Sequence, residues 1–248
     1  EPTTFNGVER PAFAKYIIPS TWSSDGIGAF GQITDKVSYE AYLVNGLDGD
    51  GLSAKEGLRD GRMHERPGLN EPAATARLDY RPFDPLRLGV SGYVGGLDNK
   101  NKGGSRGIDG HVWIVSADFD LKVQDFDFRG VVAQNTIRDD SGLPAGVAEE
   151  MFGWYLEGAY HFWPDIFKKN KLAKSDAVAF VRYDSYDTQH EMPSGVAADE
   201  RFDRNDATVG VTFKPVPNFA LKADYQFREH EAQGERGDTF NLGVGWEF

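Results

Sequence analysis

The stretch TFNLGVGWEF, from Thr239 to Phe248, alternates at every position between large apolar residues and polar or small ones. Successive side chains of a β-strand point to opposite faces of the sheet, so this period of two predicts a strand with one apolar face. That face carries Phe240, Leu242, Val244, Trp246 and Phe248, and the other carries Thr239, Asn241, Gly243, Gly245 and Glu247. If the same alternation recurs along the chain, the whole fold is built from strands.

The alternation does recur, first in the preceding segment, residues 219–228, where aromatic and aliphatic residues face Lys222, Asp224, Gln226 and Arg228. Further strands are predicted at 27–33, 37–43, 74–81, 86–94, 113–122, 126–135, 152–162, 177–183 and 207–214. About eleven strands at this spacing, without a long helical pattern, predict an all-β sandwich or barrel.

The connections between these strands distinguish a barrel from a sandwich, because they alternate between short and long. The short ones are predicted at 34–36, 82–85, 124–125 and 215–218, and the long ones at 45–72, 95–110, 138–150, 187–205 and 229–238. One exception is 163–175, a longer connection at a short-turn position. Short turns at one end and long loops at the other are typical of antiparallel transmembrane β-barrels of the bacterial outer membrane. We therefore expect residues 27–248 to form barrel strands, loops and turns.

Composition agrees with this class and excludes others. Hydrophobic residues make up 40% and charged residues 27% of the chain, and no apolar run approaches the roughly 18 residues of a spanning helix. The formal net charge of −12 argues against a nucleic-acid partner, because phosphate binding needs clustered Lys and Arg. There is no cysteine, so a disulfide framework and a thiolate metal site are excluded.

Charged residues recur on the polar side of strand after strand, which suits a water-filled lumen better than a packed core. A competing interpretation is that half or more of them are solvated outward positions or interstrand ion pairs. The candidate pore-lining residues are Arg77, Asp79, Arg81, Asp118, Asp120, Lys122, Asp127, Arg129, Glu157, Arg182, Asp184, Lys222, Asp224 and Arg228.

Other kinds of site have weaker signals. Asn45, Asp48 and Asp50 could supply oxygen ligands to calcium, but they lack the spacing and the closing Glu of an EF-hand. The five histidines are scattered, and none forms an H-x-x-x-H pair or stands beside a Ser nucleophile elbow. The Lys-rich stretch 168–174 is more often a solvated turn than a partner site. We expect no cofactor, no metal and no enzymatic activity.

Several motifs resemble the phosphate-selective porin O and P type of outer-membrane barrels and the many porins related to them. They are FNGVERP at Phe5–Pro11, AYLVNGLDG at Ala41–Gly49, FVRYDSYDTQ at Phe180–Gln189, ALKADYQF at Ala220–Phe227 and the terminal Phe248. The resemblance implies a barrel of sixteen strands, of which this chain supplies about eleven and five would precede it. It also implies that residues 1–26 fold inward as a constriction loop, with Glu9 and Arg10 near the narrowest point.

The function expected from this resemblance is passive diffusion of small polar or charged solutes through the outer membrane. The chain's net negative charge and mixed lumen argue against carrying phosphate selectivity over with it. Expected partners are outer-membrane lipids and lipopolysaccharide, the outer-membrane assembly machinery through Phe248, and two sister subunits of a homotrimer. Two alternatives stay open: a structural or adhesive barrel with a plugged lumen and ligand-binding outer loops, and a barrel enzyme such as a lipase, which would need a Ser–His pair on adjacent strands.

Overall fold

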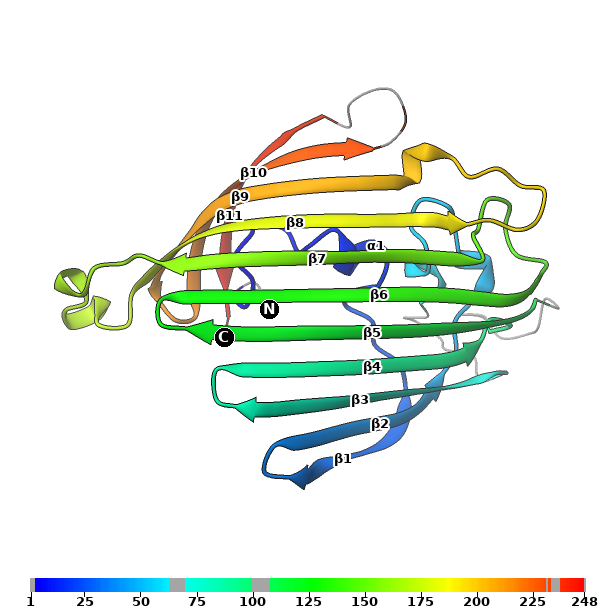
Figure 1. Ribbon diagram of the computed structural model, residues 1–248, viewed down its shortest axis with the longest axis horizontal. Helices are drawn as coiled ribbons and strands as arrows, with labels where there is room; N and C mark the ends of the chain where they lie inside the picture. Colours follow the sequence, from blue (N-terminus) through cyan, green and yellow to red (C-terminus); the bar gives the residue numbers. More distant parts are fainter. Residues whose placement is uncertain (1–2, 63–69, 100–107, 231, 233–236, 248) are drawn as a thin grey trace.

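The computed structural model describes residues 3–62, 70–99, 108–230, 232 and 237–247, and these form a single antiparallel sheet of 11 strands. Each strand pairs with its neighbours in the sequence, from β1 at one edge to β11 at the other (Figure 1). The strands are β1 Gly26–Thr34, β2 Val37–Asn45, β3 Pro72–Phe83, β4 Leu86–Gly96, β5 Asp109–Val123, β6 Phe126–Ser141, β7 Glu150–His161, β8 Asp176–Glu191, β9 Asp203–Val216, β10 Phe219–His230 and β11 Thr239–Trp246. The prediction of an all-β fold with about eleven strands is confirmed.

The sheet is strongly curved, and β9 to β11 bend round behind the middle strands (Figure 1). In the described part of the chain β1 pairs only with β2 and β11 only with β10, so the curved wall stays open. Among the described residues, helical structure is confined to α1, Phe13–Tyr16, and to the short 3-10 turns Gly49–Gly51, Arg59–Gly61, Asp165–Phe167, Asn170–Leu172 and Glu200–Phe202. No helix among the described residues is long and apolar enough to cross a membrane.

The connections have the alternating lengths that the sequence predicts. At one end the strands join through two-residue turns at 35–36, 84–85, 124–125 and 217–218, and at the other end through the segments 46–71, 97–108, 142–149, 192–202 and 231–238. The segment 162–175 between β7 and β8 is the longer connection at the short-turn end (Figure 1).

Several strands are longer than the sequence pattern predicts. β8 continues to Glu191 and β9 begins at Asp203, so the acidic connection predicted at 187–205 shrinks to 192–202. The backbone ladder pairs Asp187 with Asp203, beyond the last alternating residues. The added residues, 184–191 of β8 and 203–206 of β9, are polar on both faces apart from Tyr186, which explains why they show no alternation of apolar and polar residues.

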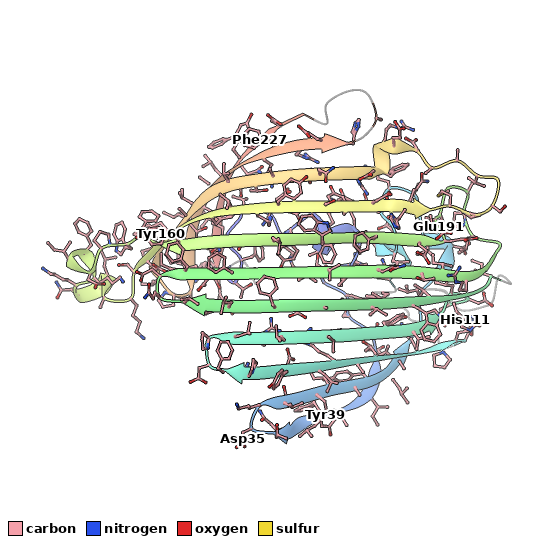
Figure 2. All side chains as sticks on the ribbon, viewed as in Figure 1. Asp35, Tyr39, His111, Tyr160, Glu191 and Phe227 are labelled. Carbon is pink, nitrogen blue, oxygen red and sulfur yellow. The ribbon has the colours of Figure 1, made fainter. Side chains whose placement is uncertain are left out.

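The two faces of the sheet differ sharply in chemistry. Large apolar side chains stand exposed on the convex face, among them Leu242 at 72%, Val115 at 64% and Val181 at 60% of their full exposure. Two of the exposed aromatic side chains, Tyr160 of β7 and Phe227 of β10, are labelled in Figure 2. A contiguous apolar surface of this extent is rare on soluble monomers and marks contact with lipid or protein.

Residues 3–25 lie against the concave face (Figure 1). An apolar core forms there, between this segment, the inner side of the wall and the loop 46–62. Its most buried members include Phe13, Ile17, Leu47, Leu52, Leu58, Ile137, Met151 and Tyr186. The core therefore sits inside the curve, towards the long-loop end, and the convex face stays bare.

We expect Val181→Arg to disturb folding into a bilayer by about 2–4 kcal/mol, because position 181 lies in the middle of the exposed apolar band. The matched change on the concave face is Asn241→Arg, where the new guanidinium can keep the contact that Asn241 makes with Asp224. Urea titrations of the protein refolded into lipid vesicles measure both variants. Equal destabilisation by the two changes would contradict the assignment of the faces.

Candidate functional site: the charged concave wall

The predicted pore-lining residues stand on the concave side of six strands. They are Arg77, Asp79 and Arg81 of β3, Asp118, Asp120 and Lys122 of β5, Asp127 and Arg129 of β6, Glu157 of β7, Arg182 and Asp184 of β8, and Lys222, Asp224 and Arg228 of β10. Along each strand they alternate with the exposed apolar residues of the convex face. The structure gathers half of them, seven of the fourteen, into two clusters, which differ in exposure.

The first cluster, the β3–β5 cluster, comprises Arg77, Asp79, Arg87 and Asp118. Arg77 donates to both Asp79 (2.7 Å) and Asp118 (2.7 Å), and Arg87 donates to the same two carboxylates at 2.9 and 2.7 Å. These side chains keep 10–30% of their exposure, so they reach the open side of the concave face. Two cations and two anions in mutual contact give this patch no net charge.

Arg87 of β4 is a member of this cluster that the sequence pattern did not single out. Arg87 is the one charged residue of β4, whereas most of the predicted lining residues share their strand with at least one other charged residue. The signal that could have found it is the register, because Arg87 lies opposite Asp120 of β5.

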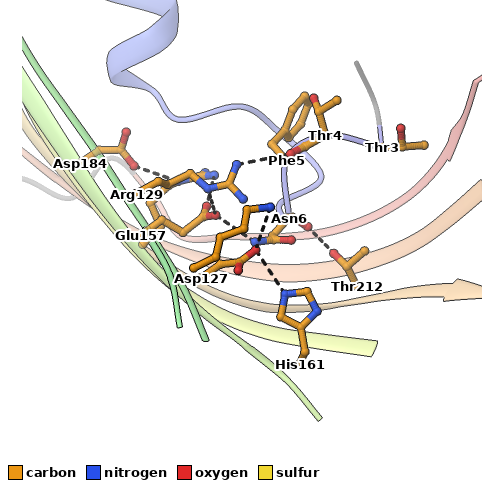
Figure 3. A network of polar contacts seen from close by, with 12 residues as sticks. Thr3, Thr4, Phe5, Asn6, Asp127, Arg129, Glu157, His161, Asp184 and Thr212 are labelled. Carbon is orange, nitrogen blue, oxygen red and sulfur yellow. Dashed lines mark hydrogen bonds and ion pairs between the residues drawn. The ribbon is translucent and has the colours of Figure 1, made fainter. Parts of the chain in front are cut away.

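The second cluster, the buried cluster, comprises Arg129, Glu157, Arg182 and Asp184 and lies beneath residues 3–13 (Figure 3). Arg182 Nε lies 3.0 Å from Asp184 Oδ2 and Nη1 lies 3.6 Å from Glu157 Oε2, while Arg129 Nε lies 3.3 Å from Glu157 Oε1. The side chains of Glu157, Arg182 and Asp184 are at most 2% exposed. Charges buried this deeply need partners for every polar atom, and the N-terminal segment supplies several of them.

The N-terminal segment is held chiefly through its own backbone. Lys222 Nζ donates to the carbonyl oxygens of Phe5 (2.5 Å) and Gly7 (2.9 Å), and Asp224 Oδ2 accepts from Val8 N at 2.5 Å. Gly7 allows this close approach, since a Cβ there would lie 2.8 Å from the Glu9 carbonyl oxygen and 3.1 Å from an Arg182 nitrogen.

Further bonds tie the segment to the buried cluster and to neighbouring strands. Asn6 donates to Glu157 at 3.0 Å, and the Phe13 amide donates to Asp184 at 3.2 Å. Polar side chains outside the predicted set also take part: Lys214 donates to Thr3 O, Thr212 to Asn6 O and Asn135 to Ile17 O. The wall thus binds the segment along most of its length.

Helix α1 adds an apolar anchor to these polar bonds. The ring of Tyr16 stacks on Tyr186 of β8 with centroids 5.3 Å apart, and the Arg204 guanidinium lies 4.4 Å from the centre of the Tyr16 ring. Phe13 and Ile17 beside it are fully buried. These ring contacts hold helix α1 in one orientation against β8, in addition to the hydrogen bonds that attach the segment to the wall.

Two hollows border the segment on the concave side. One, of about 450 Å³, is lined by charged and polar groups that include Glu9, Arg10, Lys15, Arg59 and Arg228. The other, of about 360 Å³, is lined by Trp22, Tyr93 and Ile114 together with the hydroxyl groups of Ser91 and Ser116. Glu9 and Arg10, predicted at a constriction, therefore line the more polar hollow.

The remaining predicted residues lie on the same face outside the two clusters. Lys122 and Asp127 pair at 3.9 Å near the short-turn end, where His161 contacts Asp127 (3.3 Å) and Asp176 (2.6 Å). Arg81 is exposed beside its turn, and Arg228 lies near the loop 231–238.

The residues considered as calcium ligands serve the local structure of their loop. Asn45 Oδ1 accepts from the Asp25 amide at 3.0 Å, and the Asp48 carboxylate accepts from the Asp50 amide at 3.2 Å. Among the described residues, no three His, Asp or Glu side chains converge on a point that could hold a metal ion.

The long-loop end carries a separate ion pair in the segment 192–202. Arg201 donates to Asp199 through its side chain at 2.5 and 2.9 Å and through its backbone at 3.0 Å, which lowers the pKa of Asp199 to about 2. Asp199 is therefore ionised at neutral pH.

Comparison with known proteins gives a relative and several similar structures. No family model matches the chain. An uncharacterized protein of Aquifex aeolicus (strain VF5) is 30% identical over 267 residues, which cover all of this chain and 58% of that protein. The chain thus spans less than two thirds of the curated relative it matches.

The similar solved structures share little sequence with the chain. A bacterial polysaccharide outer membrane secretin is 12% identical with a TM-score of 0.48, over 88% of this chain and 66% of that one. The outer membrane protein opdK from Pseudomonas aeruginosa is 12% identical with a TM-score of 0.42, over 90% and 69%. A BenF-like porin from Pseudomonas fluorescens Pf-5 is 12% identical with a TM-score of 0.42, over 89% and 65%.

We expect Lys222→Met to loosen residues 3–8. The change removes the ammonium group that donates to the carbonyl oxygens of Phe5 and Gly7. A buried carbonyl oxygen that loses its hydrogen-bond donor costs about 1–3 kcal/mol of folding free energy. Hydrogen exchange followed by mass spectrometry measures the change at these amides. Arg81→Met is the matched control, since it removes an exposed cation from the same face. Unchanged exchange in Lys222→Met would mean that this lysine does not hold the segment.

Proposed function

We propose that the chain forms the wall and the constriction of a passive diffusion channel for small polar or charged solutes in the bacterial outer membrane. The observation that carries the proposal is the two-faced curved sheet, apolar on its convex side and lined with paired charges on its concave side. Lipid outside and water inside are the surroundings that stabilise both faces together.

The convex face supports the membrane location. Its exposed residues are predominantly Ile, Leu, Val and aromatic side chains, and they occur on all 11 strands. Aromatic residues such as Tyr80, Phe162 and Trp246 stand near the short-turn end, where a barrel meets lipid headgroups. Phe248, expected to address the chain to the assembly machinery, lies outside the described residues.

The open edges of the sheet support a wall that closes through further strands. In lipid each unpaired backbone group costs several kcal/mol, and β1 and β11 each present a row of them. We propose that strands outside the eleven described here complete the ring, as in the sixteen-stranded barrels that the sequence resembles.

The lining supports weak rather than strong ion selectivity. The predicted lining residues contain equal numbers of cations and anions, and the β3–β5 cluster pairs them within hydrogen-bonding distance. Opposed charges of this kind orient water and polar solutes without creating a field of one sign.

The structural or adhesive barrel with a plugged lumen remains the second candidate, and one observation favours it. The N-terminal segment is bonded to β6–β10 at many points, so it would obstruct part of any lumen permanently. Conductance distinguishes a constriction from a plug.

Reconstituted into a planar bilayer, the full-length protein should conduct, and under a tenfold salt gradient its reversal potential should stay well below the roughly 59 mV of an ideally selective pore. The double variant Arg10→Gln, Arg228→Gln should shift that potential towards cation preference, because both guanidinium groups line the polar hollow. Arg201→Gln, in the segment 192–202, is the control and should have no effect. A folded, inserted protein that does not conduct would favour the plugged barrel.

The orientation has its own test in intact cells. Trypsin should cut after Arg201, whose side chain is 68% exposed at the long-loop end, and should leave the lysines of 168–174 uncut until the outer membrane is permeabilised. Gel electrophoresis with mass spectrometry identifies the fragments. Cleavage at 168–174 alone in intact cells would invert the topology.

A further inference from the structure

The connection between β7 and β8, residues 162–175, is unlike the others at its end of the wall. Four neighbouring connections there have two residues each, whereas this one contains two 3-10 turns and projects beyond the strand ends (Figure 1). It carries four lysines, Lys168, Lys169, Lys171 and Lys174, against the single acid Asp165, in a chain whose net charge is −12. We call this segment the lysine arm.

The lysine arm also exposes large apolar side chains. Ile166 is 67% exposed, Phe167 is 54% exposed and Leu172 is 39% exposed. Trp163 joins them to the convex face, because its ring lies 5.3 Å from that of Phe167 and 4.9 Å from that of Phe213 on β9. The apolar surface of the arm is thus continuous with the convex face that we place in lipid.

The arm is a folded element with internal bonds. Trp163 Nε1 donates to Ser175 Oγ at 2.8 Å, and that hydroxyl donates to the Leu172 carbonyl oxygen at 2.6 Å. The Lys168 ammonium lies 2.9 Å from Asp165, a bond that raises the pKa of Lys168. These bonds hold apolar and cationic groups together on one short projection.

We propose that the lysine arm lies in the headgroup layer of the periplasmic leaflet and binds anionic phospholipid headgroups. The inference rests on the membrane location in the proposed function. Interfacial segments insert apolar side chains at the boundary of the acyl chains and extend lysines to the phosphates, and the arm has both groups at the level where the wall leaves the bilayer. A water-exposed arm would leave Ile166 and Phe167 uncovered next to each other.

These 248 residues contain no cysteine, so one introduced cysteine is the single labelling site among them, and any cysteine elsewhere in the full-length protein is replaced with serine. Three variants of the full-length protein carry the label: Ile166→Cys on the arm, Leu242→Cys on the convex face and Gly195→Cys in the segment 192–202, where a side chain would meet nothing within 4 Å. Each is reconstituted into vesicles of phosphatidylcholine alone or mixed with an equal part of phosphatidylglycerol. Collision with oxygen and with a water-soluble nickel chelate reports the depth of the label.

In the anionic vesicles the label at 166 should be accessible to oxygen and shielded from nickel, closer to position 242 than to position 195. Replacing the four lysines with glutamine should move it towards water in anionic vesicles and leave it unchanged in phosphatidylcholine. Lys55→Gln, an exposed lysine of the loop 46–71, is the control for loss of a positive charge elsewhere and should change neither result.

A label at 166 that is as accessible to nickel as the label at 195 in both vesicles would overturn the proposal, and is also the result that a soluble acidic partner for the arm would give. A shielded label that responds neither to phosphatidylglycerol nor to the lysine changes would overturn headgroup binding. A nickel-accessible label at 242 would overturn the membrane location itself, and this inference with it.

Discussion

A continuous antiparallel ladder of backbone hydrogen bonds is the constraint on which the rest of the molecule depends. Because each strand pairs with its sequence neighbour, the register propagates from β1 to β11 and every second side chain falls on the same face. A slip of one residue anywhere would place charges such as Asp184 among the convex residues and Val181 among the concave ones. The separation of lipid-facing and water-facing chemistry is therefore a property of the ladder, and no single residue creates it.

The charges of the concave wall and the N-terminal segment stabilise each other. Arg182, Glu157 and Asp184 are buried because residues 3–13 cover them, and the segment's backbone groups are satisfied because Lys222 and Asp224 reach them. Removing one partner from such a network leaves buried groups without their bonds, which costs far more than breaking an exposed ion pair. The β3–β5 cluster, with no such cover, keeps its side chains available to solvent.

The alternation of residues 239–248 and its repeats predicted the strands, their faces and the alternating connections, because lipid on one side and polar groups on the other force a period of two. The extension of β8 to Glu191 had no such signal, because residues 184–191 are polar on both faces apart from Tyr186. Within the wall, the sequence showed which charges share a face. It could not show which of them the segment covers, because that depends on contacts between residues more than a hundred positions apart, such as Asn135 with Ile17. Lys214 and Thr212 were missed for the same reason.

The course of the N-terminal segment has a mechanical consequence. At one end Thr3 donates to Glu247, just beyond β11, and at the other end Asp25 exchanges hydrogen bonds with Asn45 immediately before β1 begins. The segment therefore crosses the concave side from one free edge of the sheet to the other. Its bonds to both edges and to β6, β7, β9 and β10 between them connect strands that the backbone ladder joins only through their neighbours, so the segment braces the curved wall from inside.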